Sequence, residues 1–147
     1  NYNNFFLNKK YLLFHLDKRC ESFSLKVIIN LKKKITSLSY DNKIVVTSNI
    51  GCNNFYNFIK KKLLNSSNIE FYDEPTLNSI ISLVYFSETC ISSHSGLIVH
   101  TAAAFNKKII DIVHDEIFNE LDRWVPFDTN YKRYNVQNFL DESFKFA

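Results

Sequence analysis

Residues 89–113 read TCISSHSGLIVHTAAAFNKKIIDIV, and their pattern indicates the fold class. It opens with a short apolar segment over residues 89–92, followed by a polar turn that contains a glycine. Residues 95–105 are apolar on nearly all sides of a helix, and residues 108–113 are rich in β-branched side chains. This order predicts a strand, a buried helix and a second strand, which together form one βαβ unit.

Strands and helices alternate along the rest of the chain as well. Apolar runs predict two further strands, over residues 11–16 and 43–47, and the shorter segment 69–72, which Glu70 interrupts, predicts a third. Apolar residues at helical spacing predict helices over residues 22–35, 53–64, 75–85, 116–124 and 139–146. Thr76 is the candidate N-cap of the third of these helices. Because the strands are apolar on both faces, we predict an α/β fold: a Rossmann-like, doubly wound parallel sheet of five or more strands, covered by helices on both sides.

The length and composition suit a single domain. Of the 147 residues, 46% are hydrophobic and 22% are charged, so a core can form and disorder is not expected. We predict a linker or edge segment over residues 1–8 and one domain over residues 9–147. Since the sequence begins with Asn1 and contains no Met, we expect a fragment or a processed piece of a longer protein.

The charge pattern argues against a nucleic-acid partner. The formal net charge is only +3, and lysine runs occur at residues 32–34 and 60–62. Both runs fall in the last turns of predicted helices, where cations complement the helix dipole. We therefore expect no nucleic-acid binding, and we keep association with a membrane surface as a secondary alternative.

The cysteines point to a reducing compartment and to no metal. Cys20, Cys52 and Cys90 are odd in number and lack the spacing of a metal site. Cys90 lies in an apolar strand, where core packing is the expected role. We expect a cytoplasmic protein, with the inner face of the membrane as an alternative location.

Ligands of an open parallel sheet bind in the crevice at the C-terminal ends of the strands. The turn after the fourth predicted strand carries Ser95 and Gly96, one of only two glycines in the chain. A glycine lets a ligand approach the backbone, and free N–H groups at a helix start bind anions. Lys18 and Arg19 follow the first strand at the same edge. We expect a diphosphate at the amides of Ser95, Gly96 and Leu97, with an ordinary capped turn and a solvated loop as the alternatives.

Four short motifs carry a family resemblance. They are Thr76-Leu77, Ile91-Ser92-Ser93-His94-Ser95-Gly96, Thr101-Ala102-Ala103-Ala104 and Lys107-Lys108-Ile109-Ile110. In this order they resemble the C-terminal, donor-binding half of GT-B glycosyltransferases, closest to the heptosyltransferase family. The resemblance implies binding of a nucleotide-diphosphate sugar for transfer to a glycan or a lipid-linked acceptor, without a metal or another cofactor.

The resemblance also assigns roles to particular residues. It implies that Ser95 and Gly96 contact the donor diphosphate, and that Lys18 or Arg19 reaches the phosphates. The residues that it places near the nucleoside are Asp73, Glu74, Thr76 and Leu77. From its position just after the fifth predicted strand, Glu116 is a further candidate for holding the ribose, with Asp115 as the alternative.

Histidines mark the departures from the family pattern. The family has Asp where this chain has His94, and a His where this chain has Val99. His94 lies in the predicted crevice and is a candidate for hydrogen bonding to a phosphate or an acceptor hydroxyl, against a purely local role in its turn. His100 lies one residue after the family position, about 100° round the helix, and is interpreted as a buried structural residue. His15, within the first strand, is interpreted as a core or supporting group.

The resemblance limits what the isolated chain can do, and two other functions stay open. In the family the deprotonating base lies on an N-terminal, acceptor-binding domain, which this sequence does not contain, so we expect the chain to lack that base. A nucleotide-sugar epimerase on the same scaffold is one alternative. A non-catalytic α/β interaction domain is the other, and it would be favoured if no nucleotide binds near Ser95 and Gly96.

Overall fold

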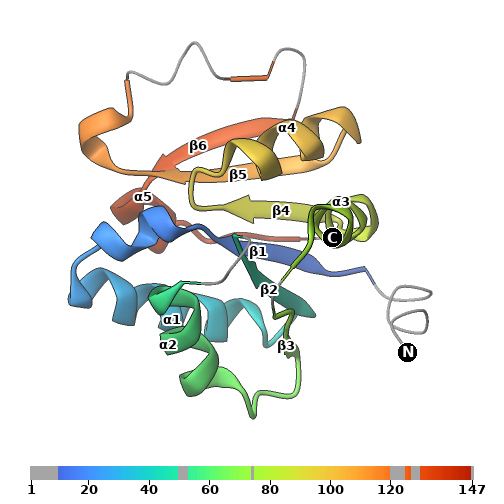
Figure 1. Ribbon diagram of the computed structural model, residues 1–147. Coiled ribbons are helices and arrows are strands. Elements are labelled where there is room, and N and C mark those ends of the chain that lie inside the picture. The colour runs from blue at the N-terminus through green and yellow to red at the C-terminus, as the bar shows by residue number, and fades with distance from the viewer. Residues whose placement is uncertain (1–9, 50–52, 74, 120–124, 127–129, 147) are drawn as a thin grey trace.

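The computed structural model describes residues 10–49, 53–73, 75–119, 125–126 and 130–146. Its centre is a sheet of six parallel strands in the order β3-β2-β1-β4-β5-β6 (Figure 1). The strands are β1 (Leu12–Leu16), β2 (Ile44–Ser48), β3 (Ile69–Phe71), β4 (Thr89–Ser92), β5 (Lys108–Val113) and β6 (Tyr131–Asn135). The helices are α1 (Leu25–Leu38), α2 (Asn54–Leu63), α3 (Leu77–Phe86), α4 (Gly96–Ala104) and α5 (Val136–Asp141), with 3₁₀ turns η2 (Lys18–Ser22) and η3 (Asp115–Ile117). This strand order is that of a Rossmann-like, doubly wound sheet, which confirms the predicted fold class.

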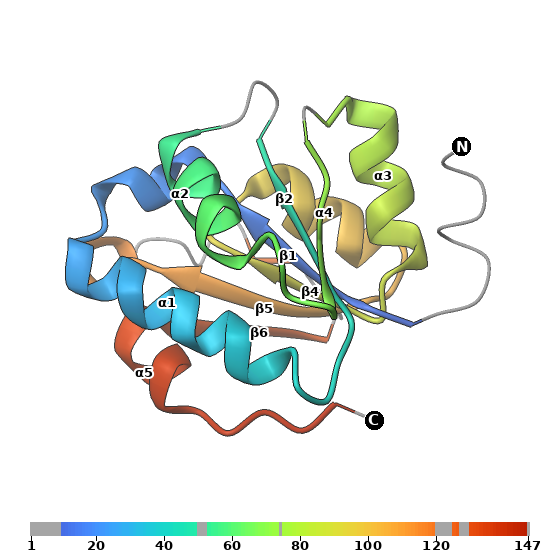
Figure 2. The ribbon, with the colours of Figure 1, turned by 90° about the horizontal axis from the view of Figure 1, so that it is seen from below.

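Helices cover both faces of the sheet because each central strand is apolar on both sides. Helices α1, α2 and α5 pack against one face, together with Phe14 and Ile110. Helices α3 and α4 pack against the other face, together with Leu13, Val45 and Ile109. Figure 2 shows the two groups of helices on opposite sides of the sheet. Successive strand residues thus enter two separate hydrophobic cores, as a buried parallel sheet requires.

Polar side chains fix the starts of the helices. Ser24, Asn53 and Thr76 each accept a hydrogen bond from the backbone N–H three residues further on. Thr76 and Ser79 form a reciprocal capping box, which confirms the predicted cap of α3. Ser95, at the start of α4, makes no such side-chain bond. Helix α4 therefore begins without a cap from its own N-cap residue.

Helix α1 ends later than predicted, and this changes the interpretation of one lysine run. Because the helix continues to Leu38, residues 32–34 lie in its middle, and the prediction that they occupy its last turn is wrong. The Lys34 ammonium donates to the backbone carbonyls of Leu140, at 3.1 Å, and Glu142. This lysine therefore joins α1 to the C-terminal segment. The run at residues 60–62 does occupy the last turn of α2, as predicted.

The C-terminal segment contains a strand and a helix boundary that the sequence pattern did not predict. Strand β6 reads YKRYN and has no apolar run, yet it pairs in parallel with β5 along its whole length. Helix α5 begins at Val136, earlier than the predicted residues 139–146, because Asn135 caps it by accepting from the N–H of Asn138. The helix predicted over residues 116–124 is, in its described part, only the 3₁₀ turn η3. The predicted linker over residues 1–8 lies outside the described residues.

The packing of α5 gives the first testable expectation. Phe139 is fully buried, and its ring centroid lies 6.1 Å from that of Phe14 in β1 and 6.4 Å from that of Tyr134 in β6. Phe139→Ala should lower the free energy of unfolding by about 3 to 5 kcal/mol, since it leaves a cavity in the core. Urea denaturation measures this loss. The control Phe105→Ala, at a side chain 36% exposed, should cost less than about 1 kcal/mol. A loss in Phe139→Ala as small as that of the control would contradict the packing of α5 into the core.

Candidate functional site

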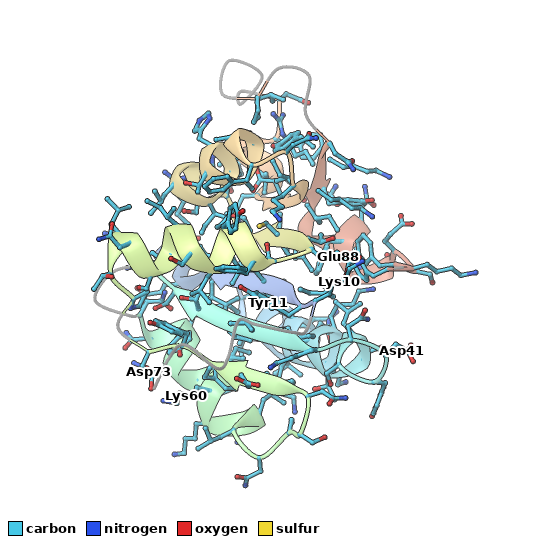
Figure 3. All side chains as sticks on the ribbon, turned by 90° about the vertical axis from the view of Figure 1, so that its right-hand side faces the viewer. Lys10, Tyr11, Asp41, Lys60, Asp73 and Glu88 are labelled. Atoms are coloured by element: carbon cyan, nitrogen blue, oxygen red, sulfur yellow. The ribbon has the colours of Figure 1, made fainter. Side chains whose placement is uncertain are left out.

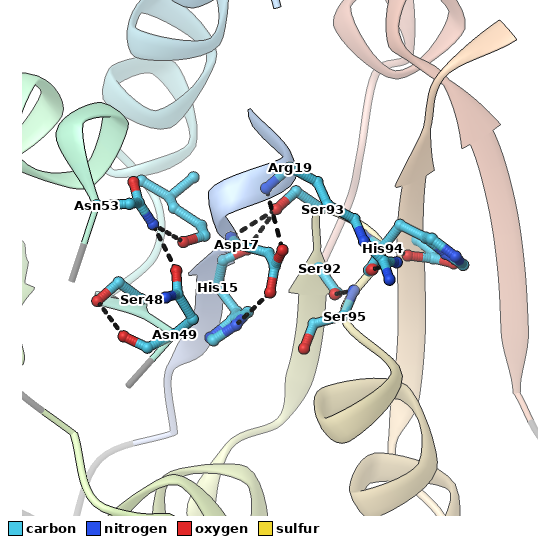
Figure 4. A network of polar contacts seen from close by, with 12 residues as sticks. His15, Asp17, Arg19, Ser48, Asn49, Asn53, Ser92, Ser93, His94 and Ser95 are labelled. Atoms are coloured by element: carbon cyan, nitrogen blue, oxygen red, sulfur yellow. Dashed lines mark hydrogen bonds and ion pairs between the residues drawn. The ribbon is translucent and has the colours of Figure 1, made fainter. Parts of the chain in front are cut away.

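The neighbouring strands β1 and β4 bring the predicted site residues to one edge of the sheet. Strand β1 continues into Asp17 and η2, and β4 continues into a turn that leads to α4. The backbone N–H of Asp17 donates to Ser93 Oγ at 2.7 Å, and Ser93 Oγ donates to the carbonyl of His15 at 3.3 Å (Figure 4). These bonds hold the two strand ends together. Since the strand order reverses at β1, this edge is the topological switch point, where doubly wound sheets bind their ligands.

A cavity of about 440 Å³ opens at this edge. Its lining comes from η2, from the turn after β4, from α4 and from strands β5 and β6. The lining residues are Arg19, His94, Gly96, Val99, His100, Asp111 and Tyr131. The volume is within the range of small-molecule sites, and the lining combines a cation, two imidazoles, a carboxylate and a phenol.

The first turn of α4 faces this cavity at Gly96. A Cβ added to Gly96 would meet no other atom within 4 Å, and the residue has no left-handed backbone angle. The fold therefore does not itself require a glycine here. The N–H of Ser95 donates to Ser92 Oγ at 2.9 Å. Among the described residues, no hydrogen-bond partner is found for the N–H of Gly96 or Leu97, so these two of the three predicted amides are available to an anion.

Arg19 is the cation that reaches the cavity. Its guanidinium Nη1 donates to the carbonyl of His94 at 2.6 Å, so the side chain spans the crevice from η2 to the turn before α4. The 3₁₀ turn is fixed by Asp17, whose carboxylate accepts from the N–H of Arg19 at 3.1 Å. Lys18 is exposed and does not line the cavity. Of the two cations predicted after β1, the structure brings Arg19 to the site.

The buried carboxylate of Asp111 is the site residue that sequence reasoning missed. It is 1% exposed, and it accepts hydrogen bonds from the N–H of His94 at 2.9 Å and from the hydroxyl of Tyr131 at 2.8 Å. Nδ1 of His94 lies 3.1 Å from the second carboxylate oxygen. Burial raises the pKa of the Tyr131 hydroxyl, and the charge of Asp111 raises it further, so the phenol stays a donor. A single acidic residue inside the apolar strand KIIDIV was the available signal, because a buried carboxylate needs partners.

His100 also belongs to the cavity, and its interpretation as a buried residue is wrong. Helix α4 buries Ile98, Val99 and Ala102 on the sheet, but its other side is exposed. His100 lies on that exposed side, four residues after Gly96, and residues four apart share one face of a helix. Both therefore border the same cavity.

His15 lies inside β1, at the position that was interpreted as a core or supporting group. Its side chain is buried, and burial lowers its pKa to about 3. Asp17 Oδ2 lies 4.0 Å from Nε2, too far for a hydrogen bond, and within the described residues neither ring nitrogen has a hydrogen-bond partner. The ring is therefore neutral in the folded protein.

The residues predicted for the nucleoside lie outside this cavity. Asp73, after β3, accepts from the Tyr56 hydroxyl at 2.7 Å and pairs with Lys60 (Figure 3). Burial raises the pKa of Asp73, but the bonds from Lys60 and Tyr56 outweigh it and lower that pKa overall. The other described candidates are exposed at element starts: Thr76 and Leu77 at α3 and Glu116 in η3. Glu74 lies outside the described residues, and the nucleoside contacts stay a prediction.

Comparison with known proteins identifies the fold. No family model and no curated protein matches the chain by sequence. The structure of E. coli heptosyltransferase WaaC with ADP matches with a TM-score of 0.61 and 12% identity, over 86% of this chain and 38% of that one. The Methanocaldococcus jannaschii UDP-GlcNAc 2-epimerase, in complex with UDP-GlcNAc and UDP, matches with a TM-score of 0.64 and 16% identity, over 94% of this chain and 39% of that one. This chain has the fold of one half of a GT-B protein.

The GT-B half fold confirms the predicted resemblance at the level of structure. The chain spans 38% and 39% of the lengths of these two proteins, the share expected for one half of their fold. No helix in the described part of this GT-B half has both the length and the apolarity needed to cross a bilayer. Its described residues also include no cluster of three or more His, Cys, Asp or Glu side chains arranged to hold a metal ion.

The buried His15 predicts a dependence of stability on pH. Its pKa is about 3 in the fold and about 6.5 in the unfolded chain, so between these values the unfolded chain binds a proton that the fold excludes. The contribution of His15 to stability is therefore complete above about pH 6.5 and is lost as the pH falls. His15→Leu removes this contribution, so the difference in unfolding free energy between wild type and variant should shift by about 2 kcal/mol from about pH 7 to about pH 5. Denaturant titrations at both pH values measure it, and an unchanged difference would contradict a neutral buried imidazole.

Proposed function

We propose that this chain is the donor-binding domain of a glycosyltransferase and that it binds a nucleotide-diphosphate sugar at the C-terminal edge of its sheet. One observation carries the proposal. The start of α4 has no side-chain cap, carries a glycine whose Cβ position is open, and faces a cavity beside Arg19.

The chemistry of this arrangement suits a diphosphate. The amides of Gly96 and Leu97 point out of the first turn of a helix, where the helix dipole adds positive potential. The guanidinium of Arg19 supplies a full positive charge with several N–H donors in a fixed plane. Amides and a cation already in place stabilise the charge that develops on a leaving diphosphate, without a metal ion or another cofactor.

The GT-B neighbours support a nucleotide as the ligand. The heptosyltransferase of similar fold was solved with ADP and with ADP-2-deoxy-2-fluoro heptose. The epimerase was solved with UDP-GlcNAc and UDP. We carry the shared chemistry, a nucleoside diphosphate joined to a sugar, over to this chain. The candidates for the nucleoside remain Asp73, Glu74, Thr76, Leu77 and Glu116.

The rest of the proposed enzyme lies beyond this chain. Since the chain matches about two fifths of each neighbour, we propose that a second, N-terminal domain binds the glycan or lipid-linked acceptor and supplies the deprotonating base. The isolated chain should then bind the donor without transferring the sugar. A cytoplasmic location, at the inner face of the membrane where a lipid-linked acceptor is used, fits such an enzyme.

A nucleotide-sugar epimerase is the second candidate. The match to the epimerase covers 94% of this chain, against 86% for the heptosyltransferase. Both candidates need the same diphosphate site. They differ in whether the sugar is released to an acceptor or altered in place, so a full-length protein given donor alone distinguishes them by its product.

The diphosphate site can be tested on the chain itself. Calorimetry with ADP, UDP and GDP should show binding of at least one of them to the wild type. Arg19→Ala should weaken that binding roughly tenfold or more, because a lost charge-assisted hydrogen bond costs about 1.5 to 3 kcal/mol. Lys18→Ala, the neighbouring exposed cation, is the matched control and should change affinity less than about threefold.

Gly96→Val tests the helix start directly. A Cβ at this position meets no protein atom within 4 Å, so the variant should fold, but the methyl groups of the valine should block the approach of a phosphate and abolish binding. Circular dichroism checks the fold. Equal affinity of wild type and folded Gly96→Val would show that the diphosphate binds elsewhere.

A further inference from the structure

The turn between β4 and α4 is organised around a histidine–carboxylate pair. His94 has a left-handed backbone, with φ of 56°, which residues other than glycine rarely adopt. Its N–H donates to one oxygen of Asp111 at 2.9 Å, and its ring Nδ1 lies 3.1 Å from the other oxygen. One buried carboxylate therefore fixes both the strained backbone and the ring of this residue. Such strain is typical of functional sites.

The pair leaves one ring nitrogen of His94 for a ligand. Since the carboxylate of Asp111 accepts from Nδ1, the hydrogen of the neutral ring is on Nδ1. Among the described residues, no hydrogen-bond partner is found for Nε2, and it is not one of the buried unpartnered atoms. His94 lines the cavity that also contains Gly96 and Arg19. A carboxylate on the far side of an imidazole stabilises its protonated form, as in the Asp-His pairs of hydrolases.

The other charged and titratable groups around His94 come from four elements. Arg19 of η2 donates to the carbonyl of His94, and His100 of α4 lines the same cavity. From β6, Tyr131 donates to Asp111, and Arg133 Nε donates to the Tyr131 hydroxyl at 3.3 Å. Asp111 of β5 is the one carboxylate among the residues that line the cavity. It faces the ring of His94, whereas His100 has no such partner among the described residues.

We propose that His94 takes up a proton when a diphosphate binds and then donates a hydrogen bond from Nε2 to a phosphate oxygen, with Asp111 as its positioning residue. The inference rests on the proposed function and adds a second cation, beside Arg19, to the neutral amides of α4. The imidazolium of His94 then lies between two anions, the phosphate and the carboxylate of Asp111. The contact is therefore strongest when negative charge develops on the leaving diphosphate.

Calorimetry detects this proton directly. Above about pH 7.5 a terminal phosphate is already ionised, since its second pKa is about 6, and contact with cations keeps it ionised, so a proton taken up on binding goes to the protein. Titrations of the chain with ADP or UDP in two buffers of different ionisation enthalpy should show uptake of up to one proton per diphosphate. Because the complex holds more protons than the free chain, affinity should fall as the pH rises, by up to about tenfold per pH unit.

The variants separate protonation from structure. His94→Asn keeps a side chain that tolerates the left-handed backbone, but it cannot take up a proton, so uptake should disappear and affinity should fall about fivefold to tenfold. Asp111→Asn should reduce the uptake as well. His100→Gln, at the second imidazole of the cavity, is the matched comparison and should retain the uptake.

The outcomes distinguish this inference from the proposed function. Binding that is lost in Gly96→Val but proceeds without proton uptake in the wild type would overturn the role of His94 and leave the donor site intact. Proton uptake that persists in His94→Asn and disappears in His100→Gln would assign the proton to His100 and would also overturn the role of His94. If the wild type binds none of the nucleoside diphosphates, both the inference and the proposed function fail.

Discussion

Parallel pairing of β1 with β4 is the interaction on which the crevice depends. The chain leaves β1 for α1 on one face of the sheet and leaves β4 for α4 on the other face, so the two connections diverge above the paired strand ends. Arg19 closes this gap by donating to the carbonyl of His94, and Ser93 ties the strand ends below it. The helix start at Gly96 and the cation of Arg19 thus converge although they are far apart in sequence.

On the sheet face that α3 and α4 cover, one row of polar residues lies between the apolar core and the candidate site. Thr47, His15, Ser92 and Asp111 are register partners across four strands, and each is buried. The strand residues that precede them on this face are apolar. Within the described residues, the side-chain polar atoms of Thr47 and His15 have no hydrogen-bond partner, and burying them costs stability, so packing alone does not explain this row. Within this row, Asp111 is fully engaged, whereas His15 supports the floor of the crevice as a neutral ring.

Local patterns predicted the parts of the structure that depend on local interactions. The apolar runs of β4 and β5, the cap at Thr76 and the position of Gly96 all follow from neighbouring residues. Strand β6 was not predicted, because its alternating charged and aromatic residues make an edge strand only through pairing with β5. The role of Asp111 depends on contacts with the turn before α4 and with β6, which no local pattern contains. His100 was placed wrongly because an apolar helix was assumed to be buried all round.

We propose above that the first turn of α4 binds the diphosphate of a nucleotide. Amide chemical shifts of the ¹⁵N-labelled chain, followed during titration with UDP or ADP, test this binding, because they report each backbone N–H separately. We predict the largest shifts at Gly96 and Leu97, with a shift of the Arg19 side-chain resonance. Largest shifts around Asp73 and Lys60, or no shifts at saturating nucleotide, would contradict it.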